Sequence, residues 1–216
     1  MADDLKVYSF SLGPLGANCF IVAQAHQCLI IDPGDEAEKV VDFLARSALT
    51  PRAILVTHGH FDHFGAVQPL ARRFRLPVYV GAPDAPQIIR PELGPLGSFP
   101  VEGVSADIVP LHGEQELQLL TPVTAIPTPG HSSGAYTFAI GRDLYVGDLL
   151  FYGSIGRTDL PGGDFDELLK SVALLARRYP PETVVHCGHG PDTSLKRELT
   201  LNPFLSALRR GQGSGL

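Results

Sequence analysis

The chain has 216 residues, a hydrophobic fraction of 44% and a formal net charge of −6 at pH 7, which predicts one compact domain over residues 1–216 with a flexible tail at 210–216. Its acidic balance and scattered basic residues disfavour nucleic acid and anionic membranes as partners. Three cysteines are too few for a disulfide framework, and no apolar run is long enough for a membrane span or export signal, so we expect a cytoplasmic location.

The first half of the chain alternates strands with helices. Short apolar runs predict strands at Val7–Leu12, Cys19–Ala23, Cys28–Ile31, Ala53–Val56 and Val78–Val80. Apolar positions at helical spacing predict helices at Glu36–Ala48 and Asp62–Phe74. Strands that alternate with helices in this way are typical of the α/β class.

A stretch rich in proline and glycine follows, from Pro83 to Gly103. It begins with a short helix, predicted at Ala85–Arg90, and continues as a loop. A loop of this length in a compact domain is either a lid or binding loop, or a surface connection. The sequence leaves both interpretations open.

The second half repeats the pattern of the first. Strands are predicted at Leu117–Leu120, Val123–Ile126, Ala135–Ile140, Leu144–Val146 and Thr183–His186. Helices are predicted at Asp164–Tyr179 and at Leu195–Arg209, where Pro203 interrupts the pattern. Two β-rich halves, each flanked by helices, predict a four-layer αβ/βα sandwich of two mixed sheets with helices outside.

Imidazoles and carboxylates gather where predicted strands end. The segment Thr57–His63 holds three histidines and an aspartate directly after an apolar run, and three further sites follow later strands. Loops at strand ends present functional groups on a rigid scaffold. Neutral imidazole and carboxylate bind zinc-like divalent ions. The candidate ligands are His58, His60, Asp62, His63, His131, Asp148 and His189.

The spacing of these residues favours two metal ions rather than one. His58 and His60 are two residues apart, so they share a face of extended backbone, and Gly59 lets the chain turn between them. Asp62 and His63 lie near the next helix start, where they can face a neighbouring ion. Paired ions lie about 3.5–4 Å apart and are bridged best by a carboxylate, for which Asp148 is the first candidate.

The other histidines give weaker evidence of a functional role. His26 and His112 lie in polar turns and are interpreted as surface residues. His186 and Cys187 lie close to His189 in the sequence. Whether either touches the site is left open, and a small buried side chain is the simpler role for Cys187.

His58-Gly59-His60-Phe61-Asp62-His63 resembles the HxHxDH signature of the metallo-β-lactamase superfamily. The resemblance runs from Gly16-Ala17-Asn18-Cys19-Phe20 to Asn202-Pro203-Phe204-Leu205. It implies an αβ/βα sandwich with the site along the edge between its sheets. It also implies one metal held by His58, His60 and His131, a second held by Asp62, His63 and His189, and Asp148 as the bridge.

Within the superfamily, the segments 147–151, 153–159 and 188–191 are similar to short bacterial glyoxalase II-like hydrolases, of the hydroxyacylglutathione hydrolase type. This likeness implies two divalent ions, Zn²⁺ first and Fe or Mn²⁺ as alternatives. It implies hydrolysis of S-lactoylglutathione or a similar small-molecule thioester by a metal-bridging hydroxide, with Asp62 and Asp148 as catalytic residues. The chain departs from the full-length pattern because it ends soon after Phe204, and because Cys187 stands where the family often has proline.

Two further side chains are candidates for substrate binding. Arg157 can grip a substrate carboxylate through paired hydrogen bonds, or it can form an ion pair with Asp159, Asp164 or Asp166. Tyr152 lies near the same loop and either lines the pocket or packs in the core.

Other functions remain open alongside the thioesterase. A persulfide dioxygenase of similar sequence would hold one iron with His58, His131 and Asp148. A metal-binding protein without catalysis would need the same ligands but no turnover. A β-lactamase is disfavoured by the expected cytoplasmic location, and a nuclease by the lack of a basic patch. The oligomeric state cannot be read from the sequence.

Overall fold

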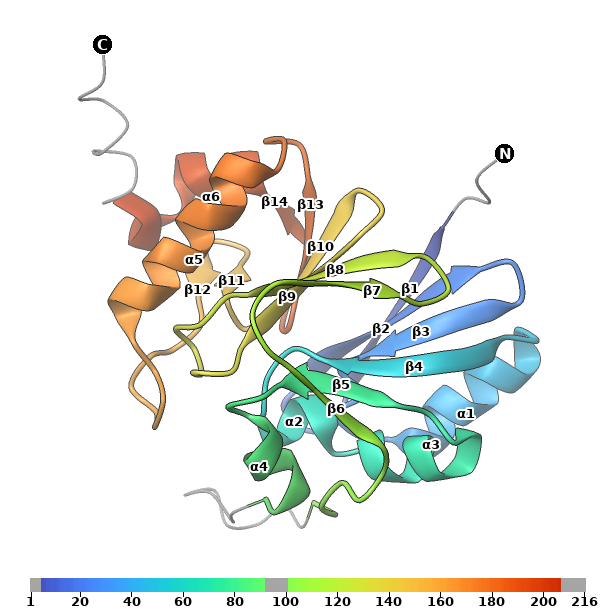
Figure 1. Cartoon of the computed structure of the whole chain (residues 1–216). Helices are drawn as coiled ribbons and strands as arrows, with labels where there is room; N and C mark the ends of the chain where they lie inside the picture. Colours follow the sequence, from blue (N-terminus) through green and yellow to red (C-terminus); the bar gives the residue numbers. More distant parts are fainter. Residues whose placement is uncertain (1–4, 92–100, 207–216) are drawn as a thin grey trace.

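A computed structural model describes residues 5–91 and 101–206 of the chain. Within these ranges two six-stranded sheets face one another, and helices cover their outer faces (Figure 1). The predicted α/β class and four-layer sandwich of mixed sheets are therefore confirmed. The predicted flexible tail at 210–216 lies outside the described residues.

The first sheet has the strand order β1-β2-β3-β4-β5-β6. Its strands are β1 (Lys6–Leu12), β2 (Ala17–Gln24), β3 (Gln27–Ile31), β4 (Thr50–Val56), β5 (Val78–Gly81) and β6 (Ile108–Leu111). The first three pair antiparallel, and β3 to β6 run parallel. Helices α1 (Ala37–Arg46) and α3 (Val67–Phe74) lie against one face of this sheet (Figure 1).

The second sheet has the order β14-β13-β10-β9-β8-β7. Its strands are β7 (Gln115–Gln118), β8 (Pro122–Pro127), β9 (Tyr136–Ile140), β10 (Asp143–Gly147), β13 (Val184–Cys187) and β14 (Thr193–Ser194). A separate small hairpin joins β11 (Leu150–Phe151) to β12 (Ser154–Ile155). Only the β10–β13 pairing is parallel among the described strands of this sheet.

Alternating side chains of the central strands build separate core layers. On β3, Cys28 and Ile30 pack with α1 and α3, whereas Leu29 and Ile31 face the second sheet. Successive residues of a strand point to opposite faces, so both faces of a central strand must be apolar to be buried. The continuous apolar runs that predicted these strands have this cause.

The longest described helix, α5 (Phe165–Arg178), covers the outer face of the second sheet. Asp164 caps its first turn by accepting a hydrogen bond from the Glu167 amide at 2.9 Å. Its buried positions Leu168, Val172 and Leu175 form one apolar stripe. None of the helices in the described ranges combines the length and the apolar composition that crossing a bilayer requires.

The helix predicted at Asp62–Phe74 is wrong as a single element. The structure divides it into α2 (Phe61–Phe64) and α3, with Gly65 and Ala66 between them. The Ala66 amide donates a hydrogen bond to the Pro33 carbonyl at 3.0 Å, so it does not continue the α2 ladder. This tertiary contact docks the end of α2, which carries two candidate ligands, against the loop after β3.

The closing helix is also shorter than the predicted Leu195–Arg209. Helix α6 (Leu195–Leu201) ends before Asn202, and a 3₁₀ turn, η1 (Pro203–Leu205), follows. Pro203 cannot donate to the helix ladder, which explains the break. Residues 207–209 lie outside the described part.

The proline-rich stretch begins as predicted with a short helix, α4 (Ala85–Ile89). Residues 92–100 of the following loop are outside the described ranges, so the choice between a lid and a surface connection stays open.

Candidate metal centre

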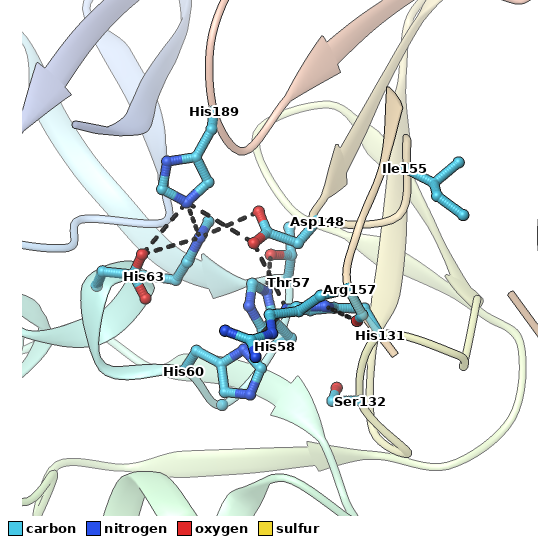
Figure 2. A network of polar contacts seen from close by, with 12 residues as sticks. Thr57, His58, His60, His63, His131, Ser132, Asp148, Ile155, Arg157 and His189 are labelled. Carbon is cyan, nitrogen blue, oxygen red and sulfur yellow. Dashed lines mark hydrogen bonds and ion pairs between the residues drawn. The ribbon is translucent and has the colours of Figure 1, made fainter. Parts of the chain in front are cut away.

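The seven candidate ligands come from the ends of four strands, in both sheets. His58 and His60 follow β4, and Asp62 and His63 lie in α2 just beyond. His131 follows β8, Asp148 follows β10, and His189 follows β13. The fold thus brings side chains from distant parts of the chain close together (Figure 2).

Site 1 consists of His58, His60 and His131. One nitrogen of each ring lies within 4.8 Å of the others, which is a spacing that one metal ion can fill. The Nδ1 of His60 and the Nε2 of His131 are 2.8 Å apart. The Nδ1–H of His131 donates to the carbonyl oxygen of Arg157 at 2.7 Å, so its Nε2 is left to bind a metal.

Site 2 consists of Asp62, His63 and His189, whose ligand atoms meet the same distance limit of 4.8 Å. The Nε2 of His189 lies 3.2 Å from Asp62 Oδ2 and 3.4 Å from the Nε2 of His63. Figure 2 shows the His63 and His189 side chains converging beside Asp148.

Asp148 lies between the two sites. Its Oδ1 is 3.3 Å from His63 Nε2 in site 2, and its Oδ2 is 3.5 Å from His131 Nε2 in site 1. A carboxylate with one oxygen toward each group of histidines is placed to bridge two cations.

Two buried atoms indicate that these residues fit a metal. Among the described residues, His58 Nε2 and Asp148 Oδ1 are buried side-chain atoms with no hydrogen-bond partner. An unsatisfied buried polar atom is costly unless a ligand completes it. His58 Nε2 is an imidazole nitrogen and Asp148 Oδ1 is a carboxylate oxygen. Both kinds of atom bind zinc-like divalent ions.

The electrostatics of His58 and His60 in site 1 favour ligand-competent forms, whereas those of His63 in site 2 favour a protonated ring that must lose its proton when metal binds. Burial and neighbouring histidines lower the pKa of His58, and they lower the pKa of His60 to about 4. Both imidazoles are then neutral, as metal binding needs. Burial opposes ionisation of Asp62, but the His189 hydrogen bond and the His63 charge hold its pKa at about 2. Burial likewise disfavours a charged His63, but Asp148 and Asp32 raise its pKa.

Asp32, in the turn after β3, supports the site although it was not singled out from the sequence. Its Oδ2 accepts from His63 Nδ1 at 2.9 Å and from the Thr57 hydroxyl at 2.6 Å, while its Oδ1 accepts from the Thr57 amide. Asp32 also falls near His58 and His63 as a third possible metal group. Because both of its oxygens are already hydrogen-bonded, we assign it to orienting His63, whose Nε2 then faces site 2.

A second residue missed from sequence is Asp84, which is buried in the loop after β5. Its carboxylate accepts from the Gly59 amide at 2.8 Å, the Ser132 hydroxyl at 2.7 Å and the Gly134 amide at 2.8 Å. Gly59 separates His58 from His60, and Ser132 follows His131. One carboxylate therefore joins the two loops that supply site 1.

Glycines allow the strand ends to approach closely. Gly147, before Asp148, has φ of 53°, and a Cβ atom there would lie 2.3 Å from the Thr57 hydroxyl oxygen. A Cβ on Gly188 would lie 2.2 Å from Asp148 Oδ1. Asn18, on β2, holds the same β13 loop by donating to the carbonyls of Cys187 and Gly190.

The serine in the Gly130–Gly134 segment does not form a nucleophile. This segment matches the G-x-S-x-G pattern of serine hydrolases. In the structure it joins two antiparallel strands, β8 and β9, rather than a strand and a helix. The Ser132 hydroxyl donates to the Asp84 carboxylate, and within the described ranges it has no hydrogen bond to a histidine that could act as its base.

Arg157 and Tyr152 are both exposed. The Arg157 guanidinium donates to both carboxylate oxygens of Asp159, from Nε at 2.7 Å and Nη2 at 2.8 Å. Of the ion pairs considered from sequence, this is the one formed. Tyr152 is 51% exposed, and the Arg197 guanidinium lies over its ring at 3.3 Å, so core packing is wrong for Tyr152. A role of either residue in substrate binding stays a prediction.

The two neighbours of His189 have other contacts. The Cys187 thiol packs in the core between the second sheet and α5, and burial raises its pKa to about 12. His186 stacks on Tyr145 and lies between two carboxylates, with Asp192 Oδ2 at 2.8 Å and Asp143 Oδ2 at 3.5 Å. Both residues therefore have structural roles among the described contacts.

We expect His186 to make stability fall at alkaline pH. Burial would lower its pKa, but Asp143 and Asp192 raise it from 6.5 to about 9. The stabilisation is therefore complete below about pH 6.5 and is lost as pH rises through 9. Urea unfolding should show His186→Asn less stable than the wild type by on the order of 2 kcal/mol at low pH, with a smaller gap at high pH. His26→Asn, in an exposed turn, is the control; a gap that does not change with pH would contradict this assignment.

Proteins of similar sequence include named hydrolases. The probable metallo-hydrolase YqgX of Bacillus subtilis (strain 168) is 37% identical over 209 residues, which cover 94% of this chain and 98% of YqgX. Hydroxyacylglutathione hydrolase GloC of Haemophilus influenzae is 29% identical over 198 residues, covering 88% of this chain and 93% of GloC.

Two crystal structures are similar over nearly the whole chain. The BLEG-1 B3 metallo-beta-lactamase has a TM-score of 0.88 and 36% identity, covering 93% of this chain and 100% of BLEG-1. A di-iron-bound form of TTHA1623 has a TM-score of 0.84 and 40% identity, covering 92% of this chain and 100% of TTHA1623. Residues 12–189 also match the sequence profile of the metallo-beta-lactamase superfamily. The chain therefore belongs to that superfamily, as a metallo-hydrolase with the dinuclear His/Asp metal site typical of its fold.

Proposed function

We propose that the protein is a thioesterase of the glyoxalase II type, which hydrolyses S-lactoylglutathione or a similar small-molecule acyl thioester. The main observation behind the proposal is the position of Asp148, which lies between the three ligands of site 1 and the three ligands of site 2. The likeness to hydroxyacylglutathione hydrolase GloC supports the choice of substrate class. Zn²⁺ is the first candidate metal, with Fe and Mn²⁺ as alternatives, and we propose a cytoplasmic location.

Two bound divalent ions would lower the pKa of water at the site and polarise the thioester carbonyl. The residues of the chain supply the rest of the chemistry. His63 and His131 hold their Nε2 atoms toward Asp148 because Asp32 and the Arg157 carbonyl occupy their Nδ1 atoms. With a pKa of about 2, Asp62 is too weak a base to take the proton of the water, which the metals would make acidic enough to lose it to solvent. Its anionic, 15% exposed carboxylate can instead accept a hydrogen bond from the attacking hydroxide and orient it. The C–S bond then breaks, and the thiolate leaves.

The first experiment is metal analysis by elemental mass spectrometry on protein purified without added metal, with S-lactoylglutathione hydrolysis assayed on the same sample. Close to two metals per chain together with thioester turnover would support the proposal. About one iron, no hydrolysis and oxygen uptake with glutathione persulfide would replace it with the dioxygenase. Bound metal without any turnover would favour a non-catalytic metal-binding protein.

A β-lactam is a second candidate substrate, because the similar structure BLEG-1 is a B3 metallo-beta-lactamase. Its strained amide could be attacked at the same site. Nitrocefin hydrolysis measured on the same sample distinguishes the two: turnover of nitrocefin with a higher kcat/KM than any thioester would make the lactam the preferred class.

We predict that Arg157→Ala raises the KM for carboxylate-bearing thioesters by about tenfold and leaves kcat nearly unchanged, because the lost contact binds substrate and transition state alike. Steady-state kinetics with S-lactoylglutathione and with an uncharged thioester test this. Asp159→Ala is the matched variant, since it frees the guanidinium without removing it. An equal rise of KM for both substrates would show that Arg157 only stabilises its loop.

A further inference from the structure

A cavity opens beside site 2, on the side of Asp62. Its volume is about 210 Å³, and it lies between the β1–β2 turn, the loop after β3 and helix α2. The apolar residues that line it are Leu12, Pro14, Leu15, Phe61 and Val101. Leu15 is 44% exposed in the turn, so its side chain is accessible to a ligand in the cavity.

The charges of the cavity are of one sign. Among the described lining residues the only charged side chains are Asp35 and Asp62. Glu36 lies at the rim, where its carboxylate accepts from the Gly13 amide at 3.1 Å, and Lys39 pairs with Glu36 outside the lining. If metal neutralises Asp62 and Lys39 offsets Glu36, the carboxylate of Asp35 still repels an anion. The cavity therefore suits an apolar, uncharged group and disfavours a carboxylate.

The size of the cavity fits one part of a substrate. Pockets that hold a whole drug-sized ligand measure roughly 300–1,000 Å³. The cavity is smaller, at about 210 Å³, and it reaches a ligand of site 2 directly. Asp62 is the candidate ligand among its lining residues, so a group bound in the cavity lies beside site 2 at that residue.

We propose that this cavity binds the acyl chain of the substrate, and that the chain is apolar and uncharged. The proposal rests on the thioesterase function. The backbone carbonyl of Arg157 holds His131 of site 1, which places this loop beside site 1, whereas the cavity adjoins Asp62 of site 2, across Asp148. A carboxylate-bearing thiol thus lies toward Arg157, and the acyl chain extends the opposite way.

The first test compares acyl chains on one thiol, using acetyl, butyryl, hexanoyl and succinyl thioesters of N-acetylcysteamine with the metal-loaded protein. We expect kcat/KM to rise about tenfold from acetyl to butyryl, because two more methylenes are buried. Succinyl should be at least about tenfold poorer than butyryl, because its carboxylate must enter an acidic, apolar cavity. Equal use of butyryl and succinyl would overturn the proposal.

The second test adds a positive charge to the cavity. Leu15→Lys should lower kcat/KM for butyryl and raise it for succinyl, a pair of opposite changes that a loss of stability cannot produce. Leu174→Lys is the matched control, because Leu174 is a comparably exposed leucine on α5, outside the lining. Changes of the same direction for both substrates in Leu15→Lys would overturn the proposal.

A further experiment distinguishes an error in the proposed thioesterase function from an error in the proposed role of the cavity. If no thioester is hydrolysed, the proposed thioesterase function is wrong. Whether the cavity binds an apolar group is then tested separately, by adding benzyl alcohol and following its binding by ¹H–¹⁵N NMR. We expect shifts of the Gly13, Leu15 and Gly65 amides, which line it, and loss of these shifts in Leu15→Lys but not in Leu174→Lys. Absence of the shifts in the wild type would overturn the proposed binding of an apolar group.

Discussion

Replacing Asp148 with alanine should remove both metal and activity. The carboxylate has one oxygen toward each site, at 3.3 Å from His63 Nε2 and 3.5 Å from His131 Nε2. Without it, two cations would face one another with no negative charge between them. We expect metal content to fall from about two ions per chain to one or fewer, and kcat/KM for the thioester to fall at least about 100-fold, since metal stabilisation of the transition state amounts to several kcal/mol.

The measurement combines elemental mass spectrometry with thioester kinetics on the same preparation. Asp166→Ala, which removes an exposed carboxylate from α5, should keep both metal and activity. A circular dichroism spectrum checks that Asp148→Ala is folded. Full activity in folded Asp148→Ala would refute the bridging role and with it the two-metal mechanism.

The fold could be predicted because its central strands are apolar on both faces. Runs such as Cys28–Ile31 are buried between α1 and α3 on one side and the second sheet on the other, so their composition alone marks them as strands. β6 was missed because it is short, half exposed and contains Pro110. The α2–α3 break was missed because a distant carbonyl, that of Pro33, causes it.

The metal ligands could be predicted for a different reason. Four of them occur within His58–His63, and a local cluster of imidazole and carboxylate is rare without a function. The other ligands each stand between or beside glycines after a strand, and the resemblance to a known signature identified them. The structure places all seven around two adjacent sites.

The supporting carboxylates could not be predicted in this way. Asp84 acts on Gly59, 25 residues before it, and on Ser132, 48 residues after it. A single aspartate in a turn has no local signal that distinguishes such a role from that of a carboxylate exposed to solvent. Only the folded arrangement shows which backbone donors meet its oxygens.

This role makes Asp84→Asn the most informative variant outside the ligands themselves. Asparagine keeps the size of the side chain but replaces one acceptor oxygen with an NH₂ donor. That donor must face an N–H of Gly59 or Gly134, so at least one buried donor loses its partner. We expect metal affinity at site 1 to fall by about 10–100-fold, as for other residues that orient metal ligands.

Chelator competition on the purified variants measures this affinity, and thioester kinetics at low and at excess metal follow its consequence. Excess metal should restore much of the activity of Asp84→Asn, because the ligands of site 1 are intact and only their positions are less well held. Ser132→Ala removes one of the three hydrogen bonds and should give a smaller change in the same direction, even if Asp84→Asn folds poorly. Asp166→Asn serves as the control. Unchanged metal affinity in both Asp84→Asn and Ser132→Ala would show that the site 1 loops hold their geometry without this carboxylate.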